Sequence, residues 1–197
     1  ATGVLKLNGT AVTAGQEILI AALQSGSAGG QTGSSGLTYE PAANDSSAKS
    51  FTISAWDGNA WSAAASVTMN LVPVNDAPIN TVPATKVVDE DQVLAFSGAD
   101  TISVSDVDST SLTTQLTVTQ GTLTLTVAGT GATVSAGASG SATVSLTGTP
   151  SQVNAALARL KYQGNKDYFG ADTLTVVTTD VEKSAGIDTD TVTLTVN

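Results

Sequence analysis

The chain has 197 residues, of which 41% are hydrophobic and 12% charged, and its net charge at pH 7 is −10. It contains no cysteine and no histidine, which excludes disulfides, thiolate nucleophiles, histidine general bases and zinc sites of the usual kind. The acidic balance argues against a nucleic-acid partner, and no apolar run approaches the roughly 18 residues that membrane insertion needs.

Turns and strands alternate along the sequence. Asn8-Gly9, Asp57-Gly58 and the glycine-rich stretch 25–36 predict turns or loops. Polar and apolar residues alternate in five further stretches, which predicts half-buried strands with threonines facing water and apolar side chains facing a core. These stretches are 112–119, 122–127, 142–146, 173–177 and 189–196. The sequence therefore predicts an all-β protein.

One stretch, 149–160, has helical spacing instead. Thr149 is a good N-cap and Pro150 suits the first helical turn. Apolar residues follow at helical spacing: Val153, Ala156, Leu157 and Leu160. We therefore predict a short helix near 150–160 that connects two strands and carries no chemistry.

The chain contains an internal repeat. Three features recur after the same 123 positions: Leu37-Thr38-Tyr39 with Leu160-Lys161-Tyr162, Phe51-Thr52-Ile53 with Leu174-Thr175-Val176, and Asp57 with Asp180. Residues 3–7 also resemble 121–125, and 67–71 resemble 192–196. The repeat predicts two related modules, 1–76 and 77–197, joined through the proline-containing segment 72–78.

The second module has a segment, about 83–120, before its match to Gly3, whereas the first has only two residues there. We expect the first module to lack its opening strands. Because missing strands expose an open edge, the first module is expected to be partly disordered or completed in trans by a strand from another copy or a neighbouring module.

The segment Val74-Asn75-Asp76-Ala77-Pro78 resembles the linker between bacterial cadherin-like repeats, which occur in giant secreted adhesins. Further similar stretches are 39–45, 51–58, 88–91, 146–162 and 169–174. The resemblance implies tandem immunoglobulin-like or cadherin-like β-sandwiches with about seven strands each, and calcium at the linkers. It also implies a non-catalytic structural or adhesive role at a bacterial surface, in an extracellular filament or in a biofilm, with surface proteins or glycans as partners.

Acidic residues near the linker are the candidate calcium ligands, because calcium takes six to eight oxygen ligands with several carboxylates among them. Asn75 and Asp76 lie in the linker, and Asp106 and Asp108 follow 30 and 32 residues after Asp76. Alternation in Asp-Val-Asp would place both carboxylates on one side of an extended segment. The first module could add Asp45 or Asp57. The alternative is that Asp106 and Asp108 only cap a turn before Ser109.

Asp89 and Glu90 form a second acidic candidate, which the family pattern would join to Asp180 and to a linker beyond Asn197. Their alternative is a solvated strand start. Four other acids are expected at turns or on exposed strands: Asp167, Asp172, Asp188 and Asp190.

The two tryptophans, Trp56 and Trp61, flank the Asp57-Gly58 turn. A sugar-stacking pair would make the chain a carbohydrate-binding module, which is the alternative function. In the other interpretation Trp56 packs in the core and Trp61 covers the end of the sandwich. A glycosidase could use two carboxylates, but no acid lies in an apolar stretch that would raise its pKa, so we expect no enzyme.

Overall fold

The computed structural model describes residues 3–18, 36–181 and 186–197. The chain divides into two compact units, Ala1–Val74 (unit 1) and Asn75–Asn197 (unit 2). This division falls two residues before the boundary that the repeat predicts. Each unit is described by itself.

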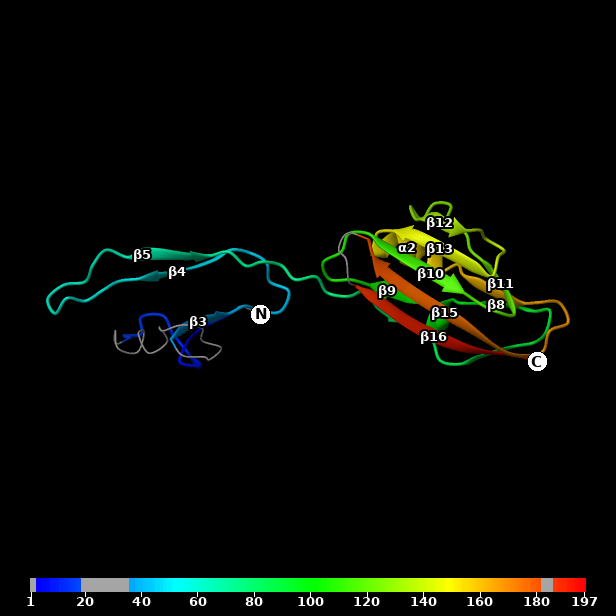
Figure 1. The fold of residues 1–197 in the computed structure, drawn as a ribbon, viewed down its shortest axis with the longest axis horizontal. Helices are drawn as coiled ribbons and strands as arrows, with labels where there is room; N and C mark the ends of the chain where they lie inside the picture. The colour runs from blue at the N-terminus through cyan, green and yellow to red at the C-terminus, as the bar shows by residue number, and fades with distance from the viewer. Residues whose placement is uncertain (1–2, 19–35, 182–185) are drawn as a thin grey trace, which may run out of the picture. The chain divides into compact units, whose positions relative to one another are not determined.

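Unit 2 is a β-sandwich. Its largest sheet has the order β12-β13-β10-β15-β16-β7, in which only the β16–β7 pair is parallel. The strands of this sheet are Thr133–Gly137 (β12), Thr143–Gly148 (β13), Leu112–Thr117 (β10), Gly170–Asp180 (β15), Ile187–Val196 (β16) and Lys86–Val88 (β7). Strands β10, β15 and β16 run side by side through its middle (Figure 1).

Two smaller sheets complete unit 2. The strands of the three-stranded sheet, in spatial order, are Gly121–Thr124 (β11), Lys161–Gly164 (β14) and Val93–Ala95 (β8). A two-stranded sheet pairs Ile79–Thr81 (β6) with Ser103–Ser105 (β9), and a 3₁₀ turn, η1, spans Gly98–Asp100. All five alternating stretches overlap strands, which confirms the predicted all-β fold.

The core of unit 2 is made by the apolar half of each alternating strand. Leu123 and Leu125 are buried, while Thr124 and Thr126 beside them are exposed. The largest side chains shielded completely from solvent include Tyr162, Phe96 and Ile102. Burying each large apolar side chain contributes about 1.5–3 kcal/mol to folding, so this core is the main source of the stability of unit 2.

The predicted helix forms as α2, Pro150–Leu157. The Thr149 side chain accepts a hydrogen bond from the Gln152 backbone N–H, and the Gln152 side chain accepts one from the Thr149 N–H. This capping box satisfies two helix-end donors at once. Val153, Ala156 and Leu157 bury the apolar face of the helix in the core, as their spacing predicts.

The described part of unit 1 consists of a small sheet and a hairpin. One sheet has the order β2-β1-β3, with strands Thr10–Ala11, Val4–Leu7 and Leu37–Glu40, and a hairpin pairs Lys49–Ile53 (β4) with Ala65–Met69 (β5). Asn8 and Gly9 form the predicted turn with φ of 49° and 83°, as a two-residue hairpin turn requires. The buried apolar side chains found among the described residues all belong to unit 2.

The strand registers of the two units correspond at the repeated positions. Leu5 lies opposite Tyr39 in unit 1, as Leu123 lies opposite Tyr162 in unit 2. A Cβ atom on Gly3 would collide with the Tyr39 ring, just as one on Gly121 would collide with the Tyr162 ring. In both units the glycine therefore leaves space for a tyrosine ring of the neighbouring strand to pack against it.

The hairpins correspond as well. Phe51 lies opposite Val67 in unit 1, and Leu174 lies opposite Val192 in unit 2.

The predicted loop 25–36 lies outside the described residues except for Gly36. Within the described part of the chain, no helix is both long enough and apolar enough to cross a membrane.

Candidate functional site

Three chain segments meet at one end of unit 2. β6 and β9 are antiparallel and pair Ile79 with Ser105, so the segment before β6 and the segment after β9 leave the sheet at the same end. Gly186, just before β16, lies at the same place, because a Cβ atom added to it would come within 2.9 Å of the Pro78 ring. Asp180, which ends β15, donates its backbone N–H to Gly186 O at 3.0 Å.

The segment after β9 is a turn organised by Asp106. Its Oδ1 accepts the backbone N–H groups of Asp108 at 3.0 Å and Ser109 at 2.9 Å. This is the turn cap weighed in the sequence analysis, and the Asp-Val-Asp segment bends here where an extended segment was expected. The cap uses only one carboxylate oxygen.

The second oxygen of Asp106 has no such role. Oδ2 is shielded from solvent and accepts no hydrogen bond, and the same holds for Ser109 Oγ and Asn75 Oδ1. Ser109 is only 8% exposed. The Asn75 amide donates to the backbone oxygen of Asp76 at 2.9 Å, which fixes the side chain. Each buried acceptor without a partner costs about 1–3 kcal/mol, so three of them at one end of the unit require an explanation.

Two further carboxylates lie at this end. Asp180 is buried and faces Leu112 across the β15–β10 pair, and Asp108 is half-buried within the turn. Asp76 is exposed. We call the set Asn75, Asp106, Asp108, Ser109 and Asp180 the oxygen cluster.

The oxygen cluster suits a hard cation, because its carboxylate, amide and hydroxyl groups present oxygen donors. Among the described residues, however, no group of three or more His, Cys, Asp or Glu side chains is arranged to hold a metal ion. A cation here would therefore rely on the amide and hydroxyl oxygens, and on backbone oxygens or water, beside the carboxylates.

The predicted ligands of unit 1 have local partners. Asp45 forms an ion pair with Lys49, with 2.7 Å between Oδ2 and Nζ, and accepts hydrogen bonds from Ser47. These interactions lower the pKa of Asp45 to about 2. Asp57 Oδ1 accepts the backbone N–H groups of Asn59 and Ala60, which lower the pKa of Asp57. Both carboxylates stabilise turns within unit 1.

The fold places the residues of the second acidic candidate at opposite ends of β16. Asp89 and Glu90 are exposed and follow β7, whose last residue pairs with Val196 at the end of β16. Asp180 lies beside the start of β16, since Thr179 pairs with Ile187. The full length of β16 therefore separates Asp180 from Asp89 and Glu90. The Glu90 backbone N–H instead donates to Asn197 O.

The two tryptophans lie together, with ring centroids 5.3 Å apart and ring planes inclined by 46°. They form an isolated antiparallel bridge beyond β4 and β5, the two strands of the hairpin labelled in Figure 1. Trp56 is 52% exposed and Trp61 55% exposed, so Trp56 does not pack in a core as one interpretation expected.

The burial of two polar residues, Asp172 and Ser109, does not follow from the sequence analysis. Asp172, expected at an exposed position, is 3% exposed and accepts hydrogen bonds from Thr119, Gln120 and Tyr162. Ser109 of the oxygen cluster was seen only as the residue after a turn. Nothing in its local sequence distinguishes it from exposed serines, although it is 8% exposed in the structure.

The comparisons with known proteins bear on unit 2 most directly. Residues 99–189, just under half of the chain, match the family model described as the Protein GAMETE EXPRESSED 2 domain. No curated protein matches the sequence.

One solved chain is similar at 14% identity and a TM-score of 0.30. It comes from the structure described as "Complete structure of manganese lipoxygenase of Gaeumannomyces graminis and partial structure of zonadhesin of Komagataella pastoris". The match covers 79% of the present chain and 58% of that chain, so the present chain spans less than two thirds of its length.

Proposed function

We propose that this chain is a non-catalytic structural or adhesive repeat of an extracellular protein at a bacterial surface or in a filament, and that calcium bound at the oxygen cluster stiffens it. The observation that carries the calcium proposal is the trio of buried, unpartnered oxygens on Asn75, Asp106 and Ser109. A cation would supply the missing partner to all three. The repeated strand registers of the two units support the role of a repeat.

The proposed effect of calcium follows from charge and position. Asp106, Asp108 and Asp180 bring negative charge to one end of a unit whose interior is apolar, and a divalent cation bound at the oxygen cluster would reduce the net charge there. Asn75 is the first residue of unit 2, and Val72 and Val74 just before it are 85% and 83% exposed. Holding Asn75 would fix the point at which the preceding segment joins the unit.

The test is calcium-dependent unfolding of the full chain. Ligand binding to the folded state adds about 2.7 kcal/mol at a concentration one hundred times the Kd, so the Tm of unit 2 should rise with calcium and fall with a chelator. Calorimetry reports both. An identical Tm in calcium and in chelator would refute the proposal, and so would an equal response to magnesium, which prefers a stricter octahedral site.

Asp106→Asn separates a metal ligand from a turn cap. Asparagine keeps an Oδ1 that can accept from Asp108 and Ser109, but replaces the unpartnered oxygen with an NH₂ group. We expect the variant to fold in chelator with at least the stability of the parent chain, and to lose the calcium-induced rise in Tm. Asp167→Asn, at an exposed carboxylate, is the matched control and should keep the rise.

The second candidate function is carbohydrate binding, favoured by the contact of two half-exposed tryptophans in unit 1. Indole rings provide apolar faces on which sugars stack, with a polar N–H for hydrogen bonding. Binding of a glycan at this pair should change tryptophan fluorescence in the parent chain, and should be lost in Trp61→Ala. If glycans leave the fluorescence unchanged, this candidate fails while the calcium proposal is unaffected.

A further inference from the structure

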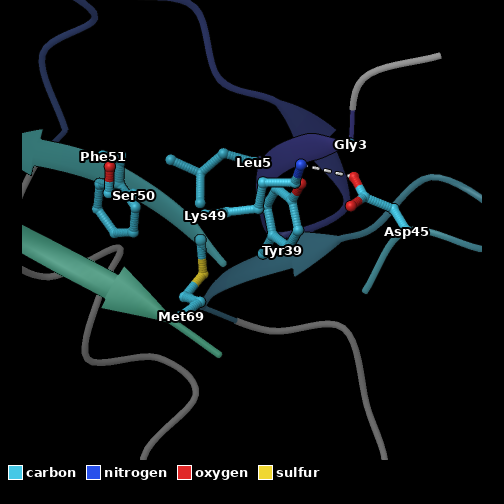
Figure 2. Close-up of a pocket in the computed structure, with 8 residues that line it drawn as sticks. All are labelled: Gly3, Leu5, Tyr39, Asp45, Lys49, Ser50, Phe51 and Met69. Carbon is cyan, nitrogen blue, oxygen red and sulfur yellow. Dashed lines mark ion pairs between the residues drawn. The ribbon is translucent and has the colours of Figure 1, made fainter. Parts of the chain in front are cut away.

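Unit 1 contains a pocket of about 300 Å³ between its sheet and its hairpin. Figure 2 shows the residues that line it, with the Lys49–Asp45 ion pair at one side and the side chains of Leu5, Tyr39, Phe51 and Met69 around the hollow. All four of these side chains are only half-buried.

The internal repeat shows what these four positions do when a unit has a complete core. By the repeat they correspond to Leu123, Tyr162, Leu174 and Leu194 of unit 2, and each of those is fully buried, at 0% exposure. The pocket of unit 1 therefore occupies the place of the core of unit 2.

The strand edge beside the pocket shows the same difference. In unit 2, β15 pairs with β16 on one side and with β10 on the other. In unit 1, the counterpart of β15 is β4, and among the described residues its one strand partner is β5, the counterpart of β16. The β4 edge that corresponds to the β10 side has no strand partner among those residues.

The exposure of Ile53 shows the effect of the missing strand partner. Its counterpart Val176 lies opposite Leu116 of β10 and is 0% exposed, whereas Ile53 is 52% exposed. An unpaired edge with an apolar side chain beside it is a template for another strand.

We propose that the β4 edge of unit 1 takes up an extended strand with the β10 pattern, which pairs with residues 52–57 and places its apolar side chains over the pocket. β10 defines the chemistry of this partner. Leu112, Leu116 and Val118 face the core of unit 2, the residues between them are polar, and none is charged. Another module of the same kind would carry such a strand.

The repeat also fixes the register. Thr117 of β10 lies opposite Thr175, and Leu112 lies opposite Asp180; the counterparts in unit 1 are Thr52 and Asp57.

The inference does not depend on calcium, because it concerns unit 1, whereas the calcium experiment measures the Tm of unit 2. Either proposal can therefore fail alone.

The test uses the full 197-residue chain and a synthetic peptide with the sequence of residues 111–119, Ser-Leu-Thr-Thr-Gln-Leu-Thr-Val-Thr. We expect amide chemical shifts of residues 52–57 to change on titration, in calcium and in chelator alike. A control peptide with L112D and L116D should bind at least tenfold more weakly. In the chain, Ile53→Asp should weaken binding by a similar factor, and Val93→Asp in unit 2, at the same 52% exposure, should not.

A cysteine experiment checks the register, since the chain has no cysteine of its own. Thr52→Cys in the chain should form a disulfide in a glutathione redox buffer with a peptide carrying Thr117→Cys, and should do so much more slowly with one carrying Gln115→Cys. The proposal is overturned if millimolar peptide causes no shift, or if the shifts fall on unit 2. Equal binding of the control peptide, or self-association of the chain that the peptide does not compete with, overturns it too.

Discussion

The Tyr162 hydroxyl donates a hydrogen bond to Asp172 Oδ2 at 2.9 Å, and both side chains are buried. The same carboxylate accepts the backbone N–H groups of Thr119, Gln120 and Thr173 and the Thr119 hydroxyl. Asp172 thus joins the start of β15 to the turn before β11 and to the β14 strand. A buried carboxylate is tolerated here because donors surround it.

Asp172→Asn should destabilise unit 2 by about 2–3 kcal/mol, because hydrogen bonds to a charged group contribute about 1.5–3 kcal/mol and the new NH₂ group would face donors. Urea unfolding of the full chain measures this loss. Tyr162→Phe is the milder control, since it removes one donor and leaves the carboxylate with its other partners. A loss from Asp172→Asn no larger than that from Tyr162→Phe would show that the backbone donors contribute little.

The stabilisation by Asp172 depends on pH. Burial raises the pKa of Asp172, but the hydrogen bonds from Thr119, Thr173 and Gln120 outweigh it and hold the pKa below its ordinary value. A carboxyl whose pKa is lower in the folded state stabilises above its unfolded pKa of about 3.9 and loses that stabilisation as pH falls through the folded pKa. The stability gap between the parent chain and Asp172→Asn should be constant near neutral pH and shrink below about pH 4.

Asn154 of α2 pairs with the edge of β9 as a strand would. Its Oδ1 accepts the Val104 N–H and its Nδ2 donates to Val104 O, both at 2.8 Å. Asn154→Ala leaves both backbone groups without these partners and should cost about 2 kcal/mol or more, at about 1–3 kcal/mol for each buried group left unsatisfied. Chemical denaturation measures it. Ala155→Ser, at an exposed position of the same helix, should change stability by less than about 0.5 kcal/mol.

The parts of the fold that could be predicted are those with a local pattern. β10 and β16 carry polar–apolar alternation over several residues, and α2 combines a cap, an initial proline and apolar spacing. β6, β7, β8 and β9 have three residues each, which is too short for a period to be visible. They are strands because distant segments pair with them.

The candidate site divides along the same line. The acidic character of the 106–108 turn is visible in the sequence, and so is its approximate relation to Asn75. The unpartnered state of Asn75 Oδ1 and Ser109 Oγ depends on the packing of segments that the sequence does not bring together. Asp172 was misplaced for the same reason, because its donors Thr119 and Gln120 lie about fifty positions away.

Thr149 should contribute to stability through the α2 cap. Thr149→Ala removes the acceptor for the Gln152 N–H and should cost about 1 kcal/mol, the usual loss for an N-cap residue. Thr149→Ser keeps the hydroxyl and should restore most of that stability. Thermal unfolding of the two variants gives the comparison, and equal losses in both would assign the effect to the threonine methyl group instead of the cap.

Asp45 should titrate about two pH units below an ordinary aspartate. The ion pair and hydrogen bond with Lys49, followed by the hydrogen bonds from Ser47, lower its pKa to about 2. Lys49→Met removes the cation and the strongest donor, so the pKa should rise towards about 3.9. Carboxyl ¹³C chemical shifts followed by NMR from pH 1.5 to 6 measure both values. Asp57 serves as the reference in the same spectra, because backbone N–H groups of Ala60 and Asn59 lower its pKa and Lys49→Met should leave its midpoint unchanged. An Asp45 midpoint that stays near pH 2 in the variant would mean that the Ser47 hydrogen bonds, and not Lys49, hold the carboxylate ionised.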